Sequence, residues 1–156
     1  MKLTDILNVS CIKIPLKAAN KEEVLEELVA ILCESDKIRD RSVVLEAVKE
    51  REKTLSTGLE NGIAIPHGKS SGVTNLVASF GISTEGIDFD SIDGEKSYIF
   101  FMLVNPEGPA GPHVKALSRI SRVLSKEQFR QKLLNAESSE EIHDLIKEEE
   151  NKYFEI

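Results

Sequence analysis

The stretch Tyr98-Ile99-Phe100-Phe101-Met102-Leu103-Val104 decides the fold. It is apolar at every position, so a strand built from it must be covered on both faces. Such a strand is typical of the middle of a sheet that has helices on both sides. The stretch is also much shorter than the roughly 20 residues of a membrane-spanning helix. The sequence therefore predicts an α/β fold in the form of a three-layer sandwich, with no insertion into a membrane.

The remaining chain supplies the other strands and the helices of such a sandwich. Short apolar or alternating runs predict strands over residues 10–16, 62–65 and 76–82. Apolar residues at helical spacing predict helices over residues 21–35, 40–52, 113–124, 126–134 and 139–149. The expected N-cap of the first helix is Asn20. The stripes expected to be buried are Val43, Val44, Ala47 and Val48 in the second helix and Val114, Leu117, Ile120, Val123 and Leu124 in the third.

Two segments are expected to lack regular structure. Residues 54–74 contain Gly58, Gly62, Gly68 and Gly72, which favour turns everywhere except at 62–65. Residues 105–112 are rich in proline and glycine and are predicted to be a loop. The chain has no internal repeat and no Gly/Ser linker, so residues 1–156 are expected to form a single domain.

Composition excludes several classes of function. The 156 residues include 20 Lys and Arg against 27 Asp and Glu, a formal charge of −7, which argues against nucleic acid as a partner. The first residues lack the apolar core of a secretory signal, so a cytoplasmic location is expected. Cys11 and Cys33 are far apart and form neither a redox pair nor a metal knuckle. Both are expected to be buried thiols.

The most informative chemistry lies in the glycine-rich stretch from Ser56 to Lys69, which ends in Pro66-His67-Gly68. Proline stiffens one side of the histidine, and glycine leaves the other side open. A neutral imidazole presented in this way can accept a proton or a phosphoryl group. From spacing alone, a hydrogen-bonded structural histidine at a strand end remains the alternative.

The other two histidines differ in their surroundings. His113 is expected at the start of a helix, where free backbone amides favour a nearby anion. His143 lies in a polar helix and is expected to be solvated. The three histidines offer no spacing typical of zinc, and residues 88–94 do not match a calcium loop, so no metal or other cofactor is expected. Phosphate-binding-loop and serine-esterase motifs are also absent from the sequence.

Several motifs together resemble a known family, enzyme IIA of the phosphoenolpyruvate-dependent sugar phosphotransferase system. The resemblance is to the fructose/mannitol class, including its nitrogen-regulatory members, and it covers nearly the whole chain. The motifs are Arg51-Glu52, Ser56-Thr57-Gly58, Gly62-Ile63-Ala64-Ile65-Pro66-His67, the turn Phe89–Gly94, and His113 followed by Leu117, Ser118 and Leu124. The resemblance implies a mixed β-sheet flanked by helices.

The resemblance also implies roles for individual residues. His67 becomes phosphorylated, His113 hydrogen-bonds the phosphoryl group or orients the ring, and Arg51 stabilises charge. The hydroxyl of Thr57 is a further candidate phosphate contact. The implied donor is the phosphocarrier HPr, and the implied acceptor is a cysteine of a separate enzyme IIB in fructose-type sugar uptake. A nucleophilic histidine with an arginine and a second histidine beside it suffices for this reaction, because phosphoryl transfer chiefly needs aligned reactants and positive charge around the phosphoryl oxygens.

Two alternatives to sugar uptake follow from the same residues. In the nitrogen-regulatory branch, phosphorylation of His67 would switch binding to other cytosolic proteins. A more remote alternative is hydrolysis or nucleotidyl transfer by the two histidines, for which no supporting motif exists. The chain also departs from the family pattern, since Glu60 replaces a second glycine after Thr57-Gly58-Leu59. This added charge is expected to affect the choice of partner.

Overall fold

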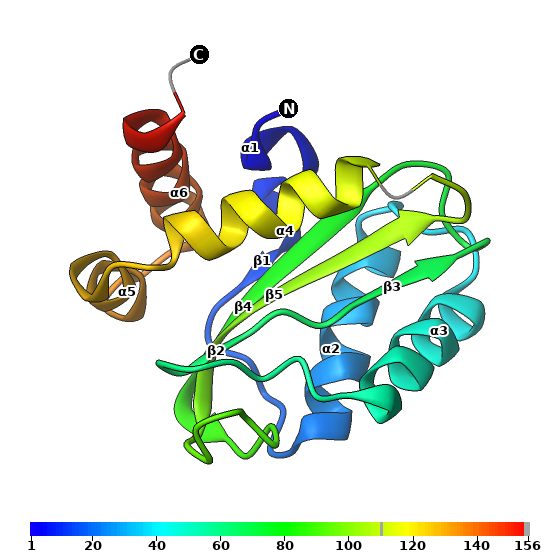
Figure 1. Cartoon of the computed structure of the whole chain (residues 1–156), viewed down its shortest axis with the longest axis horizontal. Helices are drawn as coiled ribbons and strands as arrows, with labels where there is room; N and C mark the ends of the chain where they lie inside the picture. Colours follow the sequence, from blue (N-terminus) through cyan, green and yellow to red (C-terminus); the bar gives the residue numbers. More distant parts are fainter. Residues whose placement is uncertain (110, 155–156) are drawn as a thin grey trace.

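A mixed five-stranded sheet forms the centre of the protein (Figure 1). The structure is a computed structural model, and it describes residues 1–109 and 111–154. The long strand β5 (Ser97–Pro106) lies antiparallel to β4 (Val77–Ile87), with Phe101 opposite Phe80. From Ile99 to Val104 every side chain of β5 is at most 1% exposed, so both of its faces are covered as predicted.

Three short parallel pairings complete the sheet. On one side, β1 (Ile12–Lys13) pairs with β4. On the other side, β2 (Ile63–Ala64) and then β3 (His67–Ser70) pair with successive parts of β5. The two strands follow one another along the same edge, with Pro66 between them.

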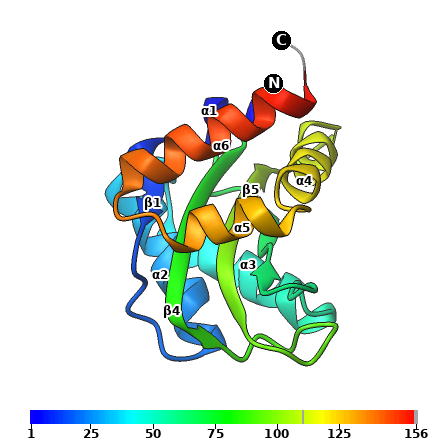
Figure 2. The ribbon, with the colours of Figure 1, turned by 90° about the vertical axis from the view of Figure 1, so that its left-hand side faces the viewer.

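Helices cover both faces of the sheet, which confirms the three-layer sandwich (Figures 1 and 2). The helices α2 (Lys21–Glu34) and α3 (Arg41–Thr54) lie on one face. The other face carries α4 (Gly111–Val123), α5 (Glu127–Leu134) and α6 (Ser139–Tyr153). No helix in residues 1–109 or 111–154 is long and apolar enough to cross a membrane.

Local signals place the starts of these helices. The side chain of Asn20 accepts a hydrogen bond from the amide of Glu23 at 2.9 Å, which confirms it as the N-cap of α2. Asp40 caps α3 in the same way, through the amides of Ser42 and Val43. These caps satisfy amides that have no partner within the helix, and so they fix the residue at which each helix begins.

The ends of the described chain are joined by a buried carboxylate. The short helix α1 (Leu3–Ile6) packs against α6, where Glu150 is 1% exposed. The amide of Leu3 donates to both carboxylate oxygens of Glu150, at 2.8 and 2.9 Å. Arg119 of α4 donates to the same carboxylate at 2.9 Å. The last helix is therefore an integral part of the packing.

Three predictions about the strands and loops need correction. The strand expected over residues 10–16 shrinks to Ile12–Lys13, because a short 3-10 helix, η1 (Val9–Cys11), precedes it. The turn-rich segment 54–74 contains the unpredicted strand β3, which forms because β5 offers it a parallel partner. Within the loop expected over 105–112, β5 runs on to Pro106 and α4 begins at Gly111, while Ala110 lies outside the described residues.

Predictions of burial also need correction at a few positions. Val43 is 38% exposed and Val114 is 61% exposed, because the buried stripes of their helices pass through other residues. In α3 the stripe runs Val44, Val48, Glu52, and in α4 it starts with His113 and Ala116. Cys11 is buried as expected, whereas Cys33 is half-buried. In both corrected stripes a polar residue takes an inward position.

Candidate functional site

His67 is the first residue of β3, at the point where the sheet edge resumes after Pro66. The amide of Leu103 in β5 donates to the carbonyl of Pro66 at 2.9 Å, and His67 itself is in register with Leu103. The central strand therefore holds the backbone on both sides of the histidine. The side chain is half-buried, so one part of the ring is packed and the rest faces the surface.

The hydrogen bond of the His67 ring defines its tautomer. Nδ1 lies 2.9 Å from the carbonyl oxygen of Ile65, two residues earlier. A carbonyl only accepts hydrogen bonds, so Nδ1 carries the proton and Nε2 keeps its lone pair. Burial lowers the pKa of His67, and the nearby Arg51 charge lowers it further, against opposing effects of the Ile65 hydrogen bond and Glu52. The ring is therefore a neutral imidazole with a nucleophilic Nε2 at neutral pH.

His113 faces His67 from the first turn of α4. The two ring centroids are 5.1 Å apart, and the ring planes are tilted by 51°. His113 is 7% exposed, and its Nδ1 is buried with no hydrogen-bond partner among the described residues. Burial lowers the pKa of His113 to about 4, helped by the charges of His67 and Lys69. His113 is therefore also neutral at pH 7 and has one ring nitrogen without a partner.

Arg51 reaches this pair of histidines from the last turns of α3. Its Nη1 donates to the carbonyl of Leu55 at 2.7 Å, where the helix ends. This contact satisfies a carbonyl that the helix leaves without a partner. The guanidinium is close enough for its charge to lower the pKa of His67. Three elements, α3, β3 and α4, thus bring Arg51, His67 and His113 close to one another.

Thr57 follows α3 and donates two hydrogen bonds to Glu52. Its hydroxyl donates to one carboxylate oxygen of Glu52 at 2.5 Å, and its amide donates to the other at 2.8 Å. The Thr57 hydroxyl therefore already donates its proton to Glu52. To donate to a phosphate instead, it would have to break this hydrogen bond and rotate towards the surface. Glu60, the departure from the family pattern, is exposed in the turn before β2.

Sequence reasoning missed the structural importance of Glu52. It lies in the charged run Lys49–Lys53, which resembles the solvated end of a helix, yet it is only 7% exposed. The available signal is its spacing, since Glu52 continues the apolar positions Val44 and Val48 at intervals of four. A charge in that position must find partners inside the protein.

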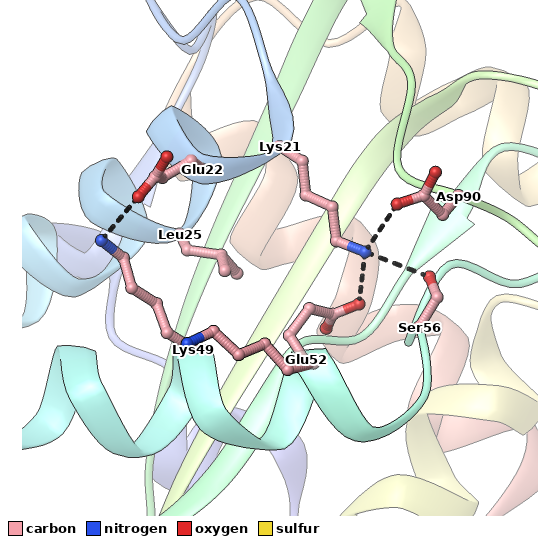
Figure 3. A pocket seen from close by; sticks show the side chains of 8 residues that line it. Lys21, Glu22, Leu25, Lys49, Glu52, Ser56 and Asp90 are labelled. Carbon is pink, nitrogen blue, oxygen red and sulfur yellow. Dashed lines mark hydrogen bonds and ion pairs between the residues drawn. The ribbon is translucent and has the colours of Figure 1, made fainter.

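A cleft of about 520 Å³ lies between α2 and α3 (Figure 3). Its lining residues are Lys21, Glu22, Leu25, Lys49, Glu52, Lys53, Ser56 and Asp90. Figure 3 shows the ammonium group of Lys21 between Glu52, Asp90 and Ser56. Glu52 therefore contacts both this cleft and the loop that carries Thr57.

The third histidine does not belong to this site. His143 lies on α6 and is half-buried. Among residues 1–109 and 111–154, no group of three or more His, Cys, Asp or Glu side chains is arranged to hold a metal ion. The site can offer a neutral nucleophile, a second imidazole and a cation, which are the groups suited to accepting an anionic phosphoryl group.

Comparison with known proteins identifies the family of the chain. The sequence profile of the family described as phosphoenolpyruvate-dependent sugar phosphotransferase system, EIIA 2, matches residues 5–149. The PTS system fructose-specific EIIABC component of Bacillus subtilis is 41% identical over 94% of this chain, which spans only 23% of that relative. The PTS system fructose-specific EIIA component of Haloferax volcanii is 36% identical over 95% of this chain and 98% of its own length.

A solved structure agrees with these sequence relatives. The nitrogen regulatory protein IIA-Ntr from Neisseria meningitidis superposes with a TM-score of 0.86 at 32% identity, over 92% of this chain and 98% of that one. The fold, the family match and the relatives of similar length converge. The chain belongs to the EIIA 2 family of the phosphoenolpyruvate-dependent sugar phosphotransferase system.

Proposed function

We propose that the protein is a phosphocarrier in which His67 is phosphorylated on Nε2. The donor is the phosphohistidine of HPr, and the acceptor is a cysteine of a separate enzyme IIB in fructose-type sugar uptake. In the first step the phosphorus–nitrogen bond of HPr breaks, a bond to Nε2 forms, and the HPr imidazole leaves. In the second step the cysteine thiolate attacks phosphorus and His67 leaves. The proposal includes a cytosolic location and one domain over residues 1–156.

The observation that carries the proposal is the hydrogen bond from Nδ1 of His67 to Ile65. It leaves the lone pair of Nε2 available for attack, and the lowered pKa keeps the ring neutral. Arg51 supplies positive charge for the phosphoryl oxygens, and His113 supplies a hydrogen bond from its ring. Neither step needs a metal ion, because charge is balanced by these side chains.

Exposed apolar residues beside the site support transfer between proteins. Leu55, whose carbonyl binds Arg51, is 70% exposed, and Val114, which follows His113, is 61% exposed. Large apolar side chains at the surface are enriched where proteins dock. A partner that buried Leu55 and Val114 would bring its own reactive group near His67.

The experiment is intact-mass analysis after incubation with phosphoenolpyruvate, enzyme I and HPr. The wild-type protein is expected to gain one phosphoryl group, and His67→Ala is expected to gain none. His143→Ala is the control, because it removes a histidine on α6 and should be phosphorylated like the wild type. Wild-type protein that stays unmodified beside phosphorylated HPr would contradict the proposal.

The likeness to the Neisseria meningitidis nitrogen regulatory protein favours a second candidate function. In this version, phosphorylation of His67 switches binding to other cytosolic proteins, and no sugar is transported. The two functions differ in their acceptor. Transfer from phosphorylated protein to an enzyme IIB cysteine supports the carrier, whereas a partner that binds only one phosphorylation state supports the regulator.

A further inference from the structure

A continuous series of hydrogen bonds connects α3 to the His67 ring. It begins where the carboxylate of Glu52 accepts the amide of Thr57 at 2.8 Å. The carbonyl of Thr57 then accepts the amide of Ile65 at 3.1 Å. Finally, the carbonyl of Ile65 accepts Nδ1–H of His67 at 2.9 Å. Each bond holds a residue whose other backbone group makes the next bond, so the carboxylate and the ring are linked through Thr57 and Ile65.

The start of this series is firmly anchored. Glu52 accepts the hydroxyl of Thr57 in addition to its amide, and it forms an ion pair with Lys21 at 3.0 Å. The Glu52 side chain is only 5% exposed, and desolvation makes a buried charge costly unless several partners satisfy it. Three donors do so here, and two of them belong to Thr57.

Lys21 joins the carboxylate to two neighbouring segments (Figure 3). Its Nζ lies 3.3 Å from a carboxylate oxygen of Asp90, 3.4 Å from the carbonyl of Phe89 and 3.5 Å from the hydroxyl of Ser56. The ammonium also lies 4.8 Å from the centre of the Phe89 ring. The loop after α3 and the loop after β4 are therefore held to α2 through one cation.

We propose that Glu52 is a positioning residue for His67, acting through Thr57 and Ile65, with Lys21 as the cation that keeps its charge in place. The inference rests on the proposed function, because it assigns a role in presenting Nε2 to a donor. Glu52 does not touch the reacting atoms. It fixes the peptide groups that select the Nδ1–H tautomer and the direction of the ring.

Charge provides a second connection between the two residues. The charged or titratable groups that face His67 are Arg51 and Glu52 from α3 and His113 from α4. Arg51 lowers the pKa of His67, and Glu52 raises it. Removing the Glu52 charge alone should therefore lower the pKa of His67 below its wild-type value.

The main test uses the double variant Lys21→Met/Glu52→Met, which removes both charges together and leaves no unpaired buried ion, since Asp90, the other partner of Lys21, is exposed. If Glu52 only balances Lys21, this variant behaves like wild type. If Glu52 positions His67, the Thr57 amide loses its acceptor and the ring loses its fixed orientation. The matched control is Glu149→Met/Lys152→Met, which removes another buried glutamate and its lysine, on α6.

Two measurements decide the outcome. Nitrogen-15 NMR of unphosphorylated protein reports the tautomer of His67, and rapid-quench kinetics report phosphoryl uptake from phospho-HPr. We expect the double variant to populate both tautomers and to accept the phosphoryl group at least about tenfold more slowly. The control should match wild type in both. A double variant with the wild-type tautomer and rate would overturn the proposal.

A second variant covers the case in which the double variant does not fold. Glu52→Gln keeps an oxygen that can accept the Thr57 amide but removes the charge, so His67 should retain its tautomer and titrate at lower pH. An unchanged pKa of His67 in this variant would contradict the connection between Glu52 and His67. The NMR readouts need no phosphorylation. If wild-type protein were never phosphorylated, the proposed function would fail while the link from Glu52 to His67 could still be judged.

Discussion

His113 and His67 face each other with ring centroids 5.1 Å apart, and His113 has a buried Nδ1 without a partner in the described part of the chain. A buried ring nitrogen without a partner is unfavourable in the resting protein. A phosphoryl group on His67 would provide a strong hydrogen-bond acceptor beside the His113 ring. The arrangement of the two histidines therefore suits a phosphorylated His67 better than an unmodified one.

Replacement of His113 by alanine should slow phosphorylation of His67 without preventing it. The phosphoryl oxygens would lose one hydrogen-bond donor, and losing a single donor of this kind lowers rates by roughly a hundredfold or more. Rapid-quench measurement of uptake from phospho-HPr checks this. His143→Ala provides the same substitution on α6 and should keep the wild-type rate. Equal rates for His113→Ala and His143→Ala would remove His113 from the mechanism.

The low pKa of His113 should make stability depend on pH. The folded pKa is about 4, below the ordinary value of 6.5, so between these pH values the unfolded chain binds a proton that the folded chain does not. Stability contributed by neutral His113 is therefore complete above pH 6.5 and decreases as the pH falls towards 4. Urea unfolding of wild type and His113→Gln at pH 7 and pH 5 tests this, because other titrating groups are common to both. Wild type should lose more stability than the variant, and an equal loss would show that His113 titrates normally.

Gly58 should not tolerate a side chain. A Cβ at this position would lie 2.6 Å from the Ser91 hydroxyl and 2.9 Å from the carbonyl oxygen of Phe89. Backbone atoms cannot easily move away, so Gly58→Ala should cost about 1–3 kcal/mol of unfolding free energy. Gly111→Ala is the control, because a Cβ there meets no atom within 4 Å. Urea denaturation should show a clear loss for the first variant alone, and similar midpoints for both would be inconsistent with the packing described.

Glu150 should be much more important for stability than its exposed neighbour. Its removal leaves the amide of Leu3 and the guanidinium of Arg119 without their shared acceptor. Unsatisfied buried groups of this kind cost about 1–3 kcal/mol. Glu150→Ala should lower the unfolding free energy by about that amount, whereas Glu148→Ala, on the exposed side of α6, should change it by less than about 0.5 kcal/mol. Thermal melting distinguishes the two, and equal shifts would argue against the buried contact.

The central layer could be predicted because its signal is local. An apolar run covered on both faces identifies β5, and an asparagine before a helical stripe identifies the start of α2. The pairing of His67 with His113 followed from the family resemblance, and the structure places the two rings together. These features depend on residue type at fixed spacing, which a sequence records directly.

The features that were missed depend on contacts between distant segments. The strand β3 consists of His67, Gly68, Lys69 and Ser70, none of which favours a strand by itself, and its structure comes from pairing with β5. Glu52 is hidden in a run of charges, and its burial becomes visible only when Lys21 and Thr57 are placed beside it. In α4 a buried histidine interrupts the apolar pattern and shifts the predicted stripe towards Val114.

The contact between Leu3 and Glu150 makes the described chain almost a closed ring. Because α1 and α6 pack together, a short linker could join the first described residues to the end of α6 without moving either helix. New ends could then be opened in the exposed turn that contains Ile92 and Gly94. Such a circular permutant would keep every helix, every strand and the two facing histidines. The order of elements along the chain is therefore not the only order that the same packing would accept.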